Sequence, residues 1–230
     1  TTSKIFPLLY FNEISKKVEP ELFQNNGSDY YINEGIKRLQ TMQLYNGSFR
    51  YWSRGDLTYD WTSIYVAHFL VEARINQKLV PDQMYNNAIH FLKIITGYQS
   101  GKVLKNKAYA NYVLSLAQQP DINSIHYSHQ NELEELDYMG RLYLAASLSL
   151  LGEKEDALNM ILSKSINNQD FEHKKYRFHS SVSYKALKLD ILRRLSPDNN
   201  QIPTLIKDIF DSTTKHGRWS STQDNIYVLL

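Results

Sequence analysis

Histidines and carboxylates are the residues of this sequence that could carry acid–base or metal chemistry. His126 and His129 are three residues apart and could share one face of a helix, but no third ligand stands near them, so a metal site is not expected there. His68 lies in an apolar stretch and is interpreted as a hydrogen-bonded core residue. The complete set of candidate histidines is His68, His90, His126, His129, His173, His179 and His216.

The carboxylates favour helix starts over catalysis. The densest acidic run, residues 132–137, is interpreted as a helix opening, because carboxylates favour the positive end of the helix dipole. Asp56 and Asp60 could pair in a cavity, although Asp60 is equally suited to cap a helix. The sequence contains no Asp-x-Asp-Asp, Asp-Asp-x-x-Asp, P-loop, glycine-rich dinucleotide turn or HExxH. No cofactor is therefore expected.

Composition excludes several further classes. The absence of cysteine excludes thiol catalysis, disulfides and Cys-ligated zinc within the 230 residues. A net charge of +2 argues against nucleic acid or an anionic membrane as the main partner. A hydrophobic content of 42% excludes a disordered chain. Thr1 opens the chain without a basic or apolar leader, so no signal peptide is recognised and we expect a domain cut at both ends.

Hydrophobic periodicity predicts helices throughout, of two kinds. Segments with a single apolar stripe have one face to bury; they are residues 29–43, 82–95, 153–166 and 200–214, with a short piece near 121–129. Segments that are apolar on nearly all sides must be covered on all sides; they are residues 60–75, 106–117 and 136–151, with which we place 3–18, 180–195 and 222 onward. Ser28, Asp82 and Asp121 are predicted N-caps.

The alternation of the two kinds predicts the architecture. Sequential helices joined by short loops pack antiparallel, so strict alternation predicts an all-α fold, an α/α toroid of the α6/α6 kind with concentric inner and outer rings. We expect one domain over residues 1–230, with the last outer helix beyond Leu230. The alternative is an open superhelix of TPR-like or HEAT-like hairpins, an interaction scaffold, although no fixed period of about 34 or 40 residues is present.

Two connections from an outer to an inner helix resemble each other. In each, a glycine is expected to end the outer helix, an aromatic residue follows two positions later, and a threonine is expected to cap the inner helix. The aromatic residue is interpreted as a wedge between layers. The positions are Gly47, Phe49 and Thr62 in the first connection and Gly217, Trp219 and Thr222 in the second.

These turns and the start of the chain are expected to converge at one end of the toroid. Aromatic residues there could line a sugar site, or simply fill the waist of the toroid; they are Tyr51, Trp52, Trp61, Tyr65 and Trp219. The residues assigned to this end are Gly47, Trp52, Asp60, Trp61, Thr62, Gly217, Trp219, Thr222 and Gln223.

The turn Gln43-x-x-x-Gly47-x-Phe49 resembles the QW-type turn of α/α-toroid proteins, including triterpene cyclases. The wider pattern resembles the thioester domain of bacterial α2-macroglobulins. Residues 1–10 are similar to the segment that directly follows the Cys-x-Glu-Gln thioester of that family, which makes Thr1, Thr2 and Ser3 thioester-adjacent. Further similar segments follow in order along the chain: residues 36–39, 47–52, 62–66, 108–114, 148–154 and 217–224.

The resemblance implies a function for the full-length protein. Members of this family are large periplasmic or secreted protease traps: a protease cleaves a bait region, an internal Cys–Gln thioester becomes exposed, and it acylates a lysine of the attacker. The implied partners are proteases and neighbouring macroglobulin-type domains of the same chain. The implied location is periplasmic or cell-envelope, with any lipid anchor outside this fragment.

The missing cysteine is the main departure from the family. Either the sequence starts just after Cys-x-Glu-Gln, or its parent lacks the thioester; in both cases this chain alone is expected to be inert and is not an enzyme. Some relatives use a histidine as an intermediate acyl acceptor, but none of the seven histidines is matched to that position. The rival interpretation is an α/α-toroid enzyme: a terpene cyclase, glycoside hydrolase or polysaccharide lyase.

Overall fold

The computed structural model is all-helical throughout the residues it describes, which are 1–10, 27–51, 57–98, 104–162, 180–215, 219 and 221–230. No strand occurs in this part of the chain, and extended pairing is limited to two isolated bridges, Gln43 with Phe49 and Arg50 with Thr58. The predicted all-α class is therefore confirmed. The chain divides into two compact units, Thr1–Asp121 (unit 1) and Ile122–Leu230 (unit 2), which are described separately.

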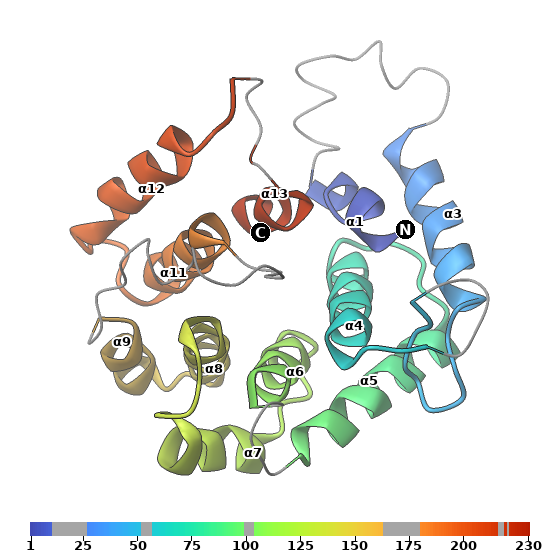
Figure 1. The fold of residues 1–230 in the computed structure, drawn as a ribbon, viewed down its shortest axis with the longest axis horizontal. Helices are drawn as coiled ribbons and strands as arrows, with labels where there is room; N and C mark the ends of the chain where they lie inside the picture. The colour runs from blue at the N-terminus through green and yellow to red at the C-terminus, as the bar shows by residue number, and fades with distance from the viewer. Residues whose placement is uncertain (11–26, 52–56, 99–103, 163–179, 216–218, 220) are drawn as a thin grey trace. The chain divides into compact units, whose positions relative to one another are not determined.

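Unit 1 is built around two helices that are buried on nearly all sides. In α4 every residue from Ser63 to Ala73 is buried, and in α6 so is every residue from Lys107 to Ser115. Helix α5 packs against both, while α1 packs against α3 (Figure 1). The helices are α1 (Thr2–Ile5), α3 (Ser28–Gln40), α4 (Asp60–Ile75), α5 (Asp82–Thr96) and α6 (Leu104–Leu116).

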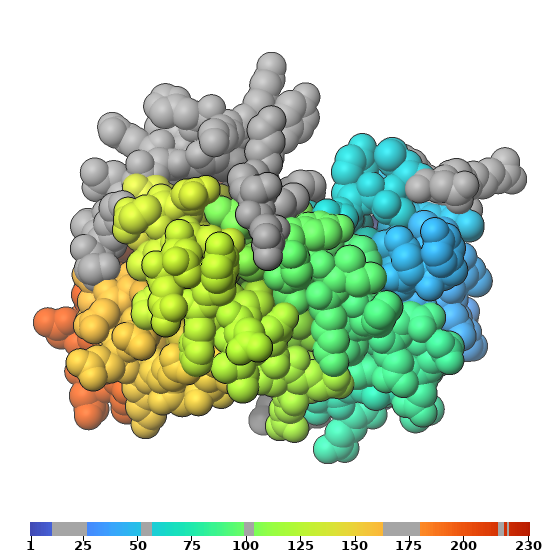
Figure 2. Space-filling view, turned by 90° about the horizontal axis from the view of Figure 1, so that it is seen from below, coloured from blue at the N-terminus to red at the C-terminus, as the bar shows by residue number. Residues whose placement is uncertain are grey.

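Helix α5 shows the other kind of element. Its apolar positions, among them Met84, Ala88 and Leu92, are buried, whereas Gln83 and His90 face solvent. Figure 2 shows α5, in green, at the surface of unit 1. A single stripe facing the core is what its sequence predicts.

Unit 2 has α8 and α11 at its centre. Helix α8 packs against α9 and α11, and α11 also packs against α12 and α13. The run from Leu142 to Leu148 in α8 is fully buried, as expected for a helix apolar on all sides. The elements are α7 (Ile122–Tyr127), the π-helix η3 (Ser128–Glu132), α8 (Tyr138–Leu151), α9 (Lys154–Leu162), α11 (Ser181–Leu195), α12 (Gln201–Asp211) and α13 (Thr222–Leu229).

Several predicted helix ends are wrong by a few residues. Helix α3 starts at Ser28 itself with Gly27 as its N-cap, and α5 starts at Asp82 with Pro81 as its N-cap. Neither polar residue caps through its side chain, because each already lies within the first turn. Asp121 directly precedes α7, where a cap was predicted, and it also accepts a hydrogen bond from Thr96 Oγ1 at 2.8 Å. The acidic run does open a helix, since Asp137 caps α8 by accepting from the backbone N–H of Gly140.

Two predictions extend beyond what the structure tests. The N-terminal helix was expected over residues 3–18; α1 covers Thr2–Ile5, and residues 11–26 lie outside the described part. Closure of the two units into one ring, and with it the single domain over residues 1–230, stays a prediction.

Candidate functional site

The segment that begins the chain is held against α3 and α4. Thr1 is exposed, Thr2 is buried and Ser3 is half-buried. Ile5 lies directly on Gly35 of α3, where an added Cβ would come within 2.4 Å of the Ile5 Cδ1 atom. Any larger residue at position 35 would therefore force the Ile5 side chain to shift.

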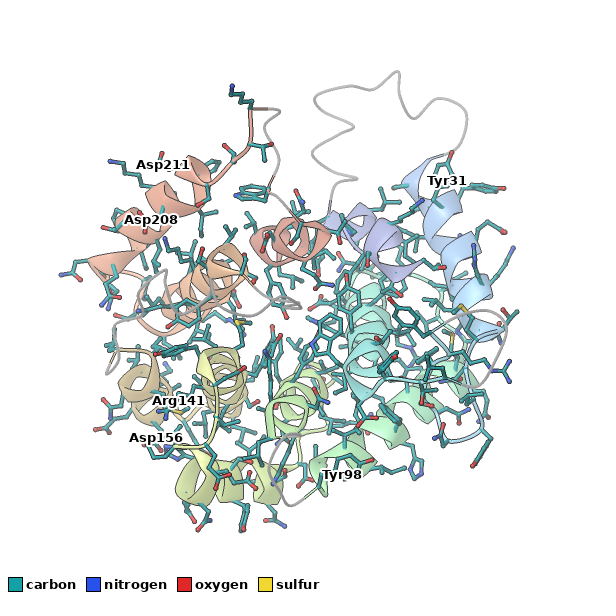
Figure 3. All side chains as sticks on the ribbon, viewed as in Figure 1. Tyr31, Tyr98, Arg141, Asp156, Asp208 and Asp211 are labelled. Carbon is teal, nitrogen blue, oxygen red and sulfur yellow. The ribbon has the colours of Figure 1, made fainter. Side chains whose placement is uncertain are left out.

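Phe6 anchors the same segment on α4. Its side chain is 0% exposed and is surrounded by three rings of one helix face. The ring-centroid distances are 5.6 Å to Tyr65, 5.2 Å to His68 and 5.5 Å to Phe69. The contacts to His68 and Phe69 are edge-to-face, an arrangement that aromatic quadrupoles favour. Figure 3 shows side chains filling the space around α1, α4 and α6 of unit 1.

A polar cluster lies beside these rings. Nδ1 of His68 is 2.9 Å from the Tyr109 hydroxyl, and Nε2 of His68 is 3.7 Å from Oε1 of Glu72. The second carboxylate oxygen of Glu72 accepts a 2.5 Å hydrogen bond from the Tyr10 hydroxyl. Burial, and then the Glu72 charge, raise the pKa of Tyr10 far above its ordinary value. The interpretation of His68 as a hydrogen-bonded core histidine is confirmed.

The Gly47 turn links α4 and α5. Gly47 has a φ of +84° and lies against the backbone of α5. Gln43 donates from Nε2 to the Met84 carbonyl at 2.9 Å, and the backbone N–H of Phe49 donates to Ser63 Oγ at 2.9 Å. Gly47 does not end α3, which stops at Gln40; it occupies the left-handed position of the turn that follows.

The start of α4 differs from the expectation at its cap. Tyr59 is the N-cap, so Thr62 lies inside the first turn and caps nothing. Trp61 stacks on Tyr65, with centroids 5.3 Å apart and ring planes 13° apart. Asp60 is the first helical residue, and its partial burial raises the pKa of its carboxyl group. Trp52 and Asp56 lie outside the described residues.

The matching turn in unit 2 joins α12 to α13. Trp219 donates from Nε1 to the Ile209 carbonyl of α12 at 2.8 Å; its role as a wedge between layers stays a prediction. The N-cap of α13 is Ser221, whose hydroxyl accepts from the Asp224 backbone N–H, so Thr222 is not the cap. Gln223 lies in the first turn, and its Oε1 is buried without a hydrogen-bond partner among the described residues. Gly217 lies outside the described residues.

Sequence analysis missed Asp224, a carboxylate that is 0% exposed. One oxygen accepts a hydrogen bond from Ser180, which caps α11, and the other accepts from Ser221 at 2.8 Å. Two helix N-termini thus share one buried acid, where both helix dipoles favour negative charge. The only sequence signal is a serine pair at the start of each helix, at residues 180–181 and 220–221.

The other histidines form no site in the described part of the chain. His126 Nε2 pairs with Glu153 at 2.6 Å, His129 is half-buried, and His90 is exposed. Among the residues that the structure describes, no group of three His, Cys, Asp or Glu could hold a metal ion. The remaining candidates, His173, His179 and His216, lie outside those residues.

The structure brings residues 1–3, Trp61 and the Gly47 turn into one unit, and places Trp219, Thr222 and Gln223 in the other. Convergence of the two sets at one end stays a prediction. No described helix is both long enough and apolar enough to cross a membrane.

Comparison with known proteins gives relatives of one kind. No protein-family model matches the chain. A protein named α2-macroglobulin from Rickettsia conorii is 27% identical over 180 residues, covering 72% of this chain and 9% of that protein. The α2-macroglobulin of Escherichia coli is 28% identical over 254 residues, covering 100% of this chain and 15% of that protein. The chain therefore spans less than a sixth of the length of either curated relative.

Solved structures share the fold over nearly the whole chain. Native E. coli α2-macroglobulin, from domain MG7 to the C-terminus, matches with a TM-score of 0.79 and 23% identity, over 99% of this chain and 38% of that one. The same protein activated by porcine elastase matches with a TM-score of 0.80 and 22% identity, over 100% of this chain and 22% of that one. Salmonella α2-macroglobulin reacted with methylamine matches with a TM-score of 0.78 and 20% identity, over 99% of this chain and 16% of that one. The resemblance to bacterial α2-macroglobulins is confirmed in sequence and in fold.

Proposed function

We propose that this chain is the thioester-domain region of a bacterial α2-macroglobulin-like protease inhibitor. The observation that carries the proposal is that the similarity to the E. coli protein runs through 100% of the chain. The proposed role is to hold and shield a Cys–Gln thioester that precedes Thr1 in the full-length protein. Where the parent lacks that bond, the same helices serve as the equivalent scaffold.

The geometry of unit 1 supports a holding role. A thioester carbonyl reacts readily with amines and water, so it must be kept from solvent until the protein is activated. Thr2, Ile5 and Phe6 are all buried, which fixes the residues that would directly follow the reactive glutamine. Aromatic side chains of α4 pack around Phe6 of this segment.

The proposed chemistry is a single acyl transfer. A lysine amine of the attacking protease adds to the thioester carbonyl, a C–N bond forms, the C–S bond breaks, and the sulfur leaves as a thiol that takes up the amine proton. Nothing in this sequence regenerates the bond, so the domain acts once and is not an enzyme. We further propose periplasmic or cell-envelope location, with neighbouring macroglobulin-type domains as the other partners.

The proposal is tested by incubating the full-length protein with trypsin and mapping covalent products by peptide mass spectrometry. An amide bond between a trypsin lysine and the glutamine that precedes Thr1 is expected. A variant of the full-length protein with alanine in place of the upstream cysteine is the matched control and should give no such bond. Absence of the bond in the wild-type protein, with trypsin cleavage intact, would show that the chain comes from a member without the thioester.

A further inference from the structure

The segment of residues 2–10 is tied to α4 at two points, one apolar and one polar. Phe6 is the apolar point, enclosed by rings of α4 as described above. Tyr10 is the polar point, through its 2.5 Å hydrogen bond to Glu72 Oε2. The two points lie four residues apart, and the backbone N–H of Tyr10 donates to the Pro7 carbonyl at 3.1 Å; residues 8–10 between and at these points are helical.

The Glu72 carboxylate is buried beside His68 of its own helix. Its side chain is largely buried, at 7% exposed for the residue as a whole. His68, one helical turn earlier, presents Nε2 to the other carboxylate oxygen at 3.7 Å. Nδ1 of that imidazole is fixed by the Tyr109 hydroxyl of α6 at 2.9 Å. The His68–Glu72 separation is longer than a hydrogen bond, whereas the Tyr10 hydroxyl is within hydrogen-bond distance of the other carboxylate oxygen.

We propose that Glu72 is a positioning residue that holds residues 2–10 against α4 through Tyr10 and thereby restrains the thioester next to Thr1. The second half of this inference rests on the proposed function. Phe6 lies six residues after the proposed reactive glutamine, about 9 Å along a helix at 1.5 Å per residue. If the Tyr10–Glu72 contact is lost, we expect residues 2–10 to become more mobile and the thioester carbonyl to become accessible to an amine.

The Tyr10–Glu72 hydrogen bond is suited to holding the segment because its acceptor is a charged carboxylate. Hydrogen bonds from a phenol to a carboxylate are among the stronger ones in proteins. Release of Tyr10 leaves Glu72 buried without that donor, which is unfavourable. The anchor thus resists fraying of a segment whose first helix, α1, has only four residues and cannot be stable by itself.

The test compares three variants of the full-length protein. Tyr10→Phe keeps the ring and removes the donor; Glu72→Leu removes the acceptor; Glu72→Gln keeps an acceptor oxygen without the charge. Amide hydrogen exchange of residues 4–9 is measured in each, together with the rate constant of methylamine incorporation at the thioester. We expect Tyr10→Phe and Glu72→Leu each to raise the amide exchange rate of residues 4–9 and the methylamine rate constant by about tenfold. Glu72→Gln should raise both rates less, because it keeps an acceptor for the Tyr10 hydroxyl.

Tyr143→Phe is the matched control. It removes another buried tyrosine hydroxyl, the one that pairs with Tyr227 in unit 2, so its cost in overall stability should be similar. It should leave exchange of residues 4–9 and the methylamine rate unchanged.

The outcomes separate this inference from the proposed function. If the wild-type protein takes up no methylamine, the proposed function and the restraint on the thioester both fall, while hydrogen exchange still decides whether Glu72 anchors the segment. If the wild-type protein reacts and Tyr10→Phe matches Tyr143→Phe in both readouts, the anchor is refuted and the proposed function stands.

Discussion

Gly47 presses its backbone against Asn87. A Cβ on Gly47 would lie 2.0 Å from the Asn87 carbonyl oxygen, and Gly47 has a φ of +84°. Both facts exclude a side chain: the conformation is strained for an L-residue, and the obstacle is helix backbone that cannot move aside. Through this contact the Gly47 turn, which precedes α4 in the sequence, packs directly against the backbone of α5.

Substitution of Gly47 should therefore be among the most destabilising changes in unit 1. Gly47→Ala is expected to lower the free energy of unfolding by about 3 kcal/mol or more, the sum of backbone strain and displacement of the turn. Urea unfolding of the 230-residue chain measures it.

Two other glycines separate the causes of that loss. Gly152 has a φ of +88° with open space around it, so Gly152→Ala should cost only about 1 kcal/mol of strain. Gly27 has a φ of −59° and open space, so Gly27→Ala should cost less still. Equal losses at Gly47 and Gly152 would mean that the contact with Asn87 contributes nothing.

Asp224 should be the most sensitive carboxylate in unit 2. Asparagine has the same shape but one acceptor oxygen, so Asp224→Asn turns an amide donor toward one of the two serine hydroxyls. We expect a loss of about 2–4 kcal/mol in the free energy of unfolding, because the acid is fully buried.

The same substitution at Asp208 is the control. Asp208, labelled in Figure 3, pairs with Lys185 at 2.8 Å on a partly exposed surface. Exposed ion pairs contribute about 0–1 kcal/mol to stability, so Asp208→Asn should change the free energy of unfolding by no more than about 1 kcal/mol. Similar thermal shifts for the two variants would contradict the role given to Asp224.

Stability should fall at alkaline pH. Burial, and then the nearby Tyr138, raise the pKa of Tyr184 to about 12 from 10.0. A group whose pKa is raised by folding stabilises the fold fully below its unfolded value and loses that contribution as pH rises through the folded value. Stability should therefore decline between pH 10 and 12, with a share on the order of 2 kcal/mol from Tyr184.

Tyr184→Phe isolates this share. Urea midpoints of the variant and the wild type are compared at pH 8, 10 and 12. The variant should decline less steeply above pH 10, since phenylalanine has no proton to lose. Parallel curves would show that ionisation of Tyr184 is not linked to folding.

The helices could be predicted from sequence because their patterns are local. The expected 60–75 coincides with α4 (Asp60–Ile75), and 106–117 overlaps α6 (Leu104–Leu116) closely. Helix caps were less predictable: Ser221 and Thr222 are adjacent and both suit the role, and only the backbone decides between them.

The anchor of residues 2–10 could not be predicted in the same way. Tyr10 and Glu72 are 62 residues apart, and neither belongs to a periodic pattern that identifies its partner. The closest sequence indication is His68 in the apolar stretch of α4, which correctly predicts a buried hydrogen bond but not the contact of Glu72 with Tyr10.

The most direct test of the central claim is the intact mass of the full-length protein before and after methylamine. The account predicts a gain of one methylamine, located at the glutamine before Thr1, with the appearance of one free thiol. An unchanged mass, with every cysteine already free, would contradict a thioester in this protein.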